Sequence, residues 1–420
     1  MRNINISKAL FLIVIVNFIV RLIAAYFYGD SRLDNEWGKL VHNLEFSGIF
    51  GINVVIDNYT AIHDFAKNTD IVLPSVFMPP LYGYLIYYIK TITFNFFEIT
   101  SLIIFIQILI SLMSIYIFFK LLNQFENQKV SLATSLVFSL FPIYIFSSVQ
   151  ISSVTIQLFL IIVYFFSLIN FLEKNDKINL VLFSITAGLL LLTRGEFIIF
   201  YFLTIFYFFI FLKKKYKQIF ISVILVTLIL TPYIKRNFDN YGTFVLTKSF
   251  GFNLLKGNNP MSKVEGSTDF ITKNYGQKIL KIKTNKKYEI NLDDFYKQKA
   301  IEIIKDNPTR YFKLYFQKIY SFLFIDLNSS YPNYYNILNI LPKILISIFA
   351  FIGGIMSFRK KGFFQFLSIY YFANIFLFSI FFILPRYSLI LLPIQILLSL
   401  KFLKFIIRKL NNKFLNNFFS

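Results

Sequence analysis

Carboxylates gather directly after the first apolar segment of the chain. Asp30, Asp34 and Glu36 follow a hydrophobic run that ends near Tyr28, and Trp37 comes next. A carboxylate held beside lipid and helix ends can have its pKa tuned for work as a general base. Trp37 suits an interfacial anchor or a platform for a sugar ring. We predict Asp34 and Glu36 as catalytic and Trp37 as substrate-binding; the alternative is a solvated acidic pair that flanks the membrane.

Arginines recur at predicted turns and helix ends, where they could bind an anion. Arg194 and Glu196 flank a glycine between two apolar segments, and Arg386 precedes Tyr387 at the start of another segment. A charge near membrane depth is costly unless it pairs or lines a cavity, and the arginine fork fits phosphate oxygens. We predict these four residues as substrate-binding. A structural Arg–Glu pair and a snorkelling Arg386 are the alternatives.

A third set of candidates follows another apolar segment. Arg236 lies at its predicted end, and Asn258 and Asn259 come after Gly257 in a stretch rich in glycine and asparagine. Asparagine side chains hydrogen-bond hydroxyls and phosphates, and glycine permits unusual turns. We predict Arg236, Asn258 and Asn259 as substrate-binding, although composition alone is also typical of an ordinary loop.

Several kinds of chemistry are excluded or disfavoured. The chain has no cysteine and only two histidines, so thiolate chemistry is excluded and a site with several histidines is disfavoured. His63 beside Asp64 could be a base with its orienting partner, or a lone surface histidine. Phosphate-binding loops, dinucleotide fingerprints and nucleophile elbows are absent from the sequence. We predict no cofactor and assign no metal site, and an activated substrate would have to bring its own energy.

Composition places these residues on a membrane protein. Of the 420 residues, 56% are hydrophobic and 15% charged, and the mean hydropathy is +0.62. Soluble domains carry about 25% charged residues. Repeated apolar runs of about 20 residues predict an all-α polytopic protein, because helices satisfy their backbone in lipid. The first run is longer than a signal-peptide core and lacks a cleavage site, so we expect a retained helix.

We predict about ten transmembrane helices in a single integral-membrane domain over residues 1–420, with no convincing internal repeat. Two prolines, Pro142 and Pro393, are expected inside helices. The predicted helices are Ala9–Tyr28, Ile99–Leu121, Val130–Ser147, Ile151–Leu172, Ile178–Leu192, Glu196–Leu212, Lys217–Tyr233, Asn336–Phe358, Phe363–Leu384 and Tyr387–Ile407.

Basic residues in the short loops predict which side of the membrane each loop faces. The formal charge of +22 reflects lysines and arginines that cluster between predicted helices, and cytoplasmic loops carry such an excess. All of these clusters lie on the cytoplasmic side only if Leu81–Phe94 and Pro308–Phe324 do not cross the membrane and instead lie at its outer surface as interfacial helices. Residues 29–98 and 234–335 then form two large extracytoplasmic loops. Anionic headgroups explain the basic charge without a nucleic-acid partner.

The ordered set of motifs resembles the GT-C superfamily of membrane glycosyltransferases, in particular its bacterial protein-mannosyltransferase-like and lipid-glycosylating branch. Asp34–Trp37 is similar to the acidic motif after the first helix. The other matching elements are Pro79–Tyr82, Thr193–Glu196 (similar to Thr-Arg-Pro-Glu), Pro232–Asn237 (similar to Pro-Trp-x-x-Arg-Asn), Gly257–Pro260 and Pro385–Tyr387.

The resemblance implies sugar transfer from a polyprenyl-phosphate donor to a glycolipid, polysaccharide or protein acceptor, on the extracytoplasmic face of a bacterial inner membrane. It implies Asp34 as the general base, and Arg194, Arg236 and Arg386 as ligands of the departing phosphate. Two alternatives stay open: a polyprenyl-linked-glycan flippase or other secondary transporter, and a non-catalytic envelope-assembly scaffold. Transporters commonly show internal repeats and charges at mid-membrane, whereas the polar residues here gather in outer loops, which favours an enzyme.

Overall fold

The computed structural model describes residues 6–53, 72–93, 98–174, 176–211, 216–331, 334–359 and 361–418; His63 and Asp64 lie outside these ranges. The elements run in the order α1 (Ile6–Tyr28), α2 (Glu36–Ser47), β1 (Gly51–Asn53), β2 (Val72–Pro74), α3 (Pro80–Ile92), α4 (Ile99–Leu122), α5 (Gln128–Ser139), α6 (Pro142–Ser148), α7 (Val154–Lys174), α8 (Lys177–Thr193), α9 (Phe197–Phe211), α10 (Tyr216–Tyr241), α11 (Phe250–Gly257), α12 (Asp269–Leu280), α13 (Tyr288–Asp306), α14 (Pro308–Leu323), α15 (Ile337–Ser357), α16 (Phe363–Phe378), α17 (Pro385–Leu389) and α18 (Leu392–Phe418).

The chain is a multi-pass integral membrane protein built from helices. By length and composition five described helices can cross a bilayer, namely α1, α4, α7, α10 and α15, and the bent pair α5–α6 makes a sixth. The shorter helices α8, α9 and α16 are also apolar. All ten predicted segments overlap described helices, but Val130–Ser147 and Tyr387–Ile407 each span two of them. Pro393 was expected inside a helix and instead lies in the first turn of α18. The hydrophobic pattern therefore located the apolar helices. Of the described helices, five, or six with the bent pair, are long and apolar enough to cross a membrane.

One predicted helix, Val130–Ser147, is in fact two helices. The chain bends by 62° between α5 and α6, and Pro142 is the first residue of α6. Proline has no N–H to donate and disfavours helical backbone in the residue before it. Phe141 is accordingly extended, with ψ of 121°. The expectation that Pro142 lies inside a continuous helix was wrong.

A buried arginine supports the α5–α6 break. Arg21 on α1 is fully buried, and its guanidinium donates to the Ser139 carbonyl over 3.2 Å and to Asn17 Oδ1 over 2.8 Å. The same guanidinium lies 4.9 Å from the centre of the Tyr144 ring. Because a helix break frees backbone carbonyls in lipid, an internal donor stabilises it. No prediction had assigned a role to Arg21.

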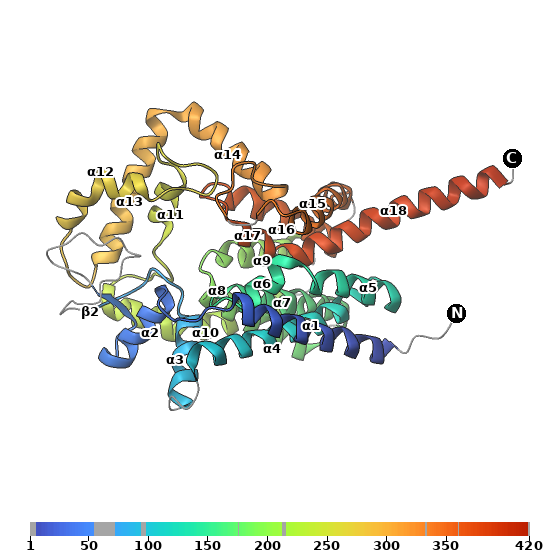
Figure 1. Cartoon of the computed structure of the whole chain (residues 1–420), viewed down its shortest axis with the longest axis horizontal. Helices are drawn as coiled ribbons and strands as arrows, with labels where there is room; N and C mark the ends of the chain where they lie inside the picture. Colours follow the sequence, from blue (N-terminus) through green and yellow to red (C-terminus); the bar gives the residue numbers. More distant parts are fainter. Residues whose placement is uncertain are drawn as a thin grey trace.

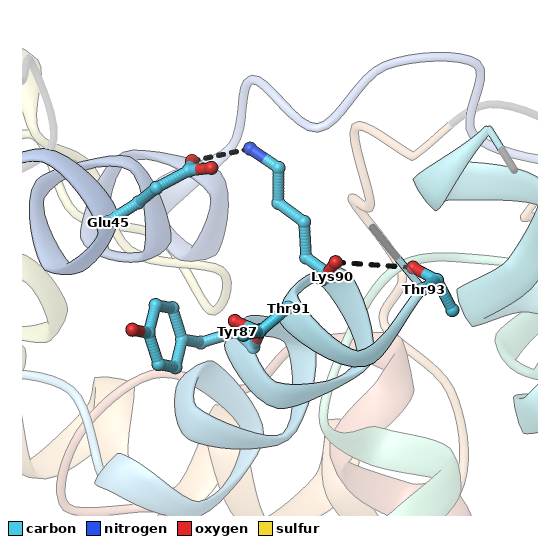
Figure 2. Close-up of polar contacts among 5 residues, drawn as sticks. All are labelled: Glu45, Tyr87, Lys90, Thr91 and Thr93. Carbon is cyan, nitrogen blue, oxygen red and sulfur yellow. Dashed lines mark hydrogen bonds and ion pairs between the residues drawn. The ribbon is translucent and has the colours of Figure 1, made fainter. Parts of the chain in front are cut away.

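The first predicted outer segment folds as α2, a short antiparallel β1–β2 ladder and α3. Gly51 pairs with Pro74 in the ladder, an element that the sequence analysis did not predict. Trp37 on α2 packs edge-on against Tyr82 on α3, with ring centres 5.1 Å apart. Figure 2 shows the ion pair between Glu45 and Lys90 that joins the same helices. The helix predicted over Leu81–Phe94 is confirmed up to Ile92, and Phe94 lies outside the described residues.

The second predicted outer segment contains α11, α12, α13 and α14. In Figure 1, α12 and α13 lie at the end of the molecule where α2 and β2 also lie, whereas α1 begins and α18 ends at the opposite end. The two long polar segments of the sequence therefore fold toward one end of the helical body. Residues that are more than 200 positions apart in the chain meet there.

Candidate functional site

The acidic motif forms the start of a helix. Asn35 caps α2, because its side-chain oxygen accepts the backbone N–H groups of Trp37 at 3.1 Å and Gly38 at 3.2 Å. Glu36 is consequently the first residue of α2 and is half-buried, whereas Asp34 precedes the cap and is exposed. The positive end of the helix dipole favours a carboxylate in the first turn.

The turn between α8 and α9 positions Arg194 and Glu196. Their side chains form an ion pair at 3.4 Å, with Arg194 23% exposed and Glu196 38% exposed. The Arg194 Nε atom is buried and has no hydrogen-bond partner among the described residues. A buried donor without a partner is unfavourable, so this nitrogen is a donor that the described protein leaves unused.

The segment before α18 brings Arg386 and Tyr387 to the same place. Tyr387 is half-buried, its ring centre lies 5.8 Å from the Arg194 guanidinium carbon, and it lies 5.9 Å from the ring of Phe382. Phe382 in turn supports Lys256, whose Nζ atom lies 4.6 Å from the ring centre. Two aromatic rings therefore separate the cations of Arg194 and Lys256.

The charges of Glu36 and Arg386 act on Lys256, and those of Arg194 and Arg386 act on Tyr387. The pKa of Lys256 is lowered by burial and by the positive charge of Arg386, and the negative charge of Glu36 opposes this shift. Burial raises the pKa of Tyr387, and the charges of Arg194 and Arg386 oppose that rise. These residues come from α2, the α8–α9 turn, α11 and α17. We call them the Arg386 cluster: Glu36, Arg194, Glu196, Lys256, Arg386 and Tyr387.

Two predicted binding residues, Asn258 and Asn259, are buried and bonded to backbone. The Asn258 amide donates to the carbonyls of Leu254 at 2.9 Å and Ile380 at 2.8 Å, and the Asn259 amide donates to Ser267 at 2.8 Å. The bond to Ile380 ties the end of α11 to the segment that leads to Arg386. This geometry supports positioning of the cluster, and contact with substrate stays a prediction.

Lys318 lies beneath the same junction. This α14 residue is fully buried, and its ammonium group donates to the Gly257 carbonyl and to Asn258 Oδ1, both at 2.9 Å. Burial lowers the pKa of Lys318 to about 7. The burial of Lys318 could not be predicted from the sequence, because nothing local distinguishes this residue from the other lysines of its helix.

Arg236 and Trp37 lie in structural positions. The Arg236 guanidinium donates to the carbonyls of Ser75 at 2.7 Å and Phe50 at 2.6 Å, and to Asn237 Oδ1 at 2.8 Å. It therefore links α10 to the chain on both sides of the β ladder. Trp37 is 5% exposed and belongs to the hydrophobic core. Their roles as substrate ligands remain predictions without support from these contacts.

Glu289 on α13 holds the segment before α3. It is buried and accepts hydrogen bonds from Ser75 Oγ at 2.8 Å and from the backbone N–H groups of Val76 at 2.6 Å and Phe77 at 3.1 Å. Burial raises the pKa of Glu289 to about 7, against the lowering effect of these bonds and of the Arg236 charge. The carboxylate thereby anchors one large outer segment to the other.

Lys256 of the cluster, and Phe382, whose ring contacts Lys256 and Tyr387, were not predicted from the sequence. Lys256 directly precedes the Gly-Asn-Asn motif, so its neighbourhood was noted but the residue was not selected. Phe382 is one of 56 phenylalanines and carried no signal. Among the described residues, no group of three or more histidine, aspartate or glutamate side chains is placed to hold a metal ion.

Comparisons with known proteins concern the fold. The apo oligosaccharyltransferase of Archaeoglobus fulgidus matches with a TM-score of 0.58 at 14% identity, over 100% of this chain and 52% of that one. The archaeal oligosaccharyltransferase AglB from Archaeoglobus fulgidus, in complex with an inhibitory peptide and a dolichol-phosphate, matches with a TM-score of 0.53 at 12% identity, over 97% of this chain and 51% of that one. The fold is GT-C-like. ArnT from Cupriavidus metallidurans, bound to undecaprenyl phosphate, gives 0.44 at 11% identity, over 93% and 77%.

The GT-C-like fold agrees with the resemblance seen in the motifs, at the level of architecture. No protein-family model matches the chain, and no curated protein matches it. The chain spans about half the length of the oligosaccharyltransferase structures that it matches. Similar architecture does not by itself establish activity, so function has to be argued from the site.

Proposed function

We propose that the protein is a glycosyltransferase that uses a polyprenyl-phosphate sugar as donor, with a glycolipid, polysaccharide or protein as acceptor, on the extracytoplasmic face of the membrane. The observation that supports the proposal is the Arg386 cluster, in which cations and carboxylates from four separate elements contact one another or act on one another electrostatically. One fold-related enzyme was solved with a dolichol-phosphate, a lipid of the same chemical class.

The cations of the cluster suit a phosphate leaving group. Arg194, Lys256 and Arg386 would stabilise the negative charge that develops on the phosphate oxygen as the bond to the anomeric carbon breaks. The buried and unpartnered Arg194 Nε supplies a donor that is not already used within the described protein. The half-buried ring of Tyr387 would border the same phosphate.

A carboxylate would take the proton of the acceptor. In this step the acceptor atom bonds to the anomeric carbon, the donor's carbon–oxygen bond breaks, and its electron pair stays on the phosphate. The negative charge of Glu36 acts on the pKa of Lys256, whereas Asp34 is exposed just outside the helix cap. The motif resemblance favours Asp34 as the base, and the position of Glu36 makes it the competing candidate.

The experiment is sugar transfer by purified protein in lipid nanodiscs, with a panel of radiolabelled polyprenyl-monophosphate sugars and a membrane extract as the source of acceptor. Loss of transfer in Arg386→Gln, on the order of 10²-fold, is expected if this side chain stabilises the leaving phosphate. Comparing Asp34→Asn with Glu36→Gln identifies the base, because the variant that lacks the base should still bind the donor but should lose turnover.

Controls separate chemistry from general charge. Lys273→Gln removes an exposed positive charge from α12 and should leave transfer unchanged. Full transfer by both Asp34→Asn and Glu36→Gln would remove the acidic motif from the reaction. Transport of the lipid-linked sugar without transfer would instead support the flippase alternative.

A further inference from the structure

A groove runs along the outer face of α14, separate from the Arg386 cluster. Its volume is about 1190 Å³, and its walls are α14 and the segments 262–264 and 326–328. Pockets that take drug-sized molecules have volumes of about 300–1,000 Å³. The groove is thus large enough for an elongated ligand.

The groove is basic near one end of α14. Arg310 and Lys313, in the first half of the helix, are exposed, as is Lys263 across the groove. The Arg310 guanidinium also donates to the Pro260 carbonyl, so the two walls are joined at this end. The Asp326 carboxylate lines the groove too, but it is buried and accepts the Asn328 N–H at 2.9 Å.

The groove is aromatic toward the other end of α14. Phe316 is 52% exposed and Tyr320 is 46% exposed in the second half of the helix, and Leu327 opposite them is 64% exposed. This end approaches the membrane helices, because the Phe322 ring centre lies 6.4 Å from that of Phe378 on α16, and Phe324, directly after α14, lies 6.4 Å from Phe351 on α15. Large exposed apolar side chains beside membrane helices indicate contact with lipid chains.

The opposite face of α14 packs on the protein. Tyr311 and Lys318 are buried and do not line the groove, and Lys318 bonds to Gly257 and Asn258 below the Arg386 cluster. A ligand in the groove would therefore lie on the far side of α14 from the proposed donor site. It would hold the helix without occupying that site.

We propose that this groove binds an anionic two-chain phospholipid of the bilayer, with its headgroup at Lys263, Arg310 and Lys313 and an acyl chain along Phe316, Tyr320 and Leu327. The charge and the apolar surface are arranged in the order in which a phospholipid presents its head and tail. Basic residues near a membrane surface each contribute about 1 kcal/mol of attraction to anionic lipid, which corresponds to about fivefold in affinity.

The test measures lipid binding directly. Delipidated protein in detergent is titrated with phosphatidylglycerol or with phosphatidylcholine of the same chain length, and bound lipid is counted by native mass spectrometry. The variant Lys263→Gln/Lys313→Gln removes two headgroup contacts and keeps the Arg310 bond to Pro260. The matched control Lys273→Gln/Lys283→Gln removes the same charge from exposed positions outside the groove.

The expected result is one tightly held phosphatidylglycerol in the wild type and the control, weaker phosphatidylcholine binding, and at least tenfold weaker phosphatidylglycerol binding in the groove variant. A melting curve checks that the groove variant is folded, and Phe316→Ser, which should also weaken binding, serves as an independent second variant. Equal binding of the two lipids, or unchanged binding by both groove variants, would overturn the proposal. Preferential retention of a polyprenyl monophosphate in the groove would overturn it as well. Sugar transfer is not the readout, so this test and that of the proposed function fail separately.

Discussion

The ammonium group of Lys318 lies 2.9 Å from the side-chain oxygen of Asn258, at the end of α11, the helix that carries Lys256. Its second acceptor, the Gly257 carbonyl, is also a neutral oxygen. Asn258 in turn donates to the Ile380 carbonyl, on the segment that leads to Arg386. Through Asn258, the buried lysine therefore stabilises both α11, which carries Lys256, and the segment that leads to Arg386.

The first prediction concerns the pH dependence that Lys318 confers. Its folded pKa of about 7 lies below the ordinary 10.5, because burial disfavours the charged form. Between these values the unfolded chain binds more protons than the folded one, so stability should rise with pH from about 7 to 10.5. Lys318→Met should remove this rise and, at pH 9–10, cost about 1–3 kcal/mol through two unsatisfied acceptors. Melting in nanodiscs between pH 6 and 10 measures both effects.

The control for this prediction is Lys305→Met, which changes an exposed lysine at the end of α13. It should keep the pH profile of the wild type. A Lys318→Met protein with an unchanged profile would show that Lys318 keeps an ordinary pKa in the folded protein.

The second prediction concerns Glu289, where the sign is opposite. Its folded pKa of about 7 lies above the ordinary 4.5, so between these values the folded state binds the extra proton. The contribution to stability is fully present below about pH 4.5 and is lost as pH rises through 7. Glu289→Gln can accept the Val76 N–H and bond Ser75, so it should fold and abolish this pH-dependent step. Asp294→Asn, which breaks the surface pair with Lys248, should preserve the step in the same melting series.

The helices could be predicted because lipid leaves few alternatives. An apolar run of about 20 residues must form helix to satisfy its backbone, so segments such as Ile99–Leu121 followed from composition alone. The break at Pro142 was missed because proline is tolerated in many membrane helices. What decides this case is a side chain from another helix, Arg21, which bonds the Ser139 carbonyl at the break.

The site was only partly predictable, for a related reason. Arg194, Arg386 and Tyr387 were selected by type and position, and the structure brings them together. Arg236 had the same apparent signal, but its donors are used on backbone carbonyls around the β ladder. Sequence shows which groups can bind an anion, whereas tertiary contacts determine which of them remain available to bind one.

The third prediction tests the cations of the cluster by donor binding. Lys256→Gln and Arg386→Gln should each weaken binding of a polyprenyl monophosphate by about tenfold, as expected when a charge-assisted hydrogen bond worth about 1.5–3 kcal/mol is lost. Arg236→Gln should instead lower the melting temperature, because its bonds to Ser75 and Phe50 are structural. Scintillation binding with a radiolabelled polyprenyl monophosphate, together with melting curves, distinguishes the two outcomes. Equal binding by wild type, Lys256→Gln and Arg386→Gln would place the phosphate site elsewhere.

The fourth prediction concerns the close approach of two backbone segments at Gly257. A Cβ atom there would lie 2.1 Å from the Phe381 carbonyl oxygen, and a backbone atom cannot rotate away. Gly257→Ala should therefore separate α11 from the segment before Arg386, at a cost of about 1–3 kcal/mol, and should weaken polyprenyl-monophosphate binding. Gly48→Ala is the matched control, because Gly48 has open space around it and only the strain of a positive φ of 70°, worth about 1 kcal/mol. It should lower the melting temperature slightly and leave binding intact. If Gly257→Ala binds the lipid as the wild type does, the junction of α11 with the Phe381 segment does not position the cations.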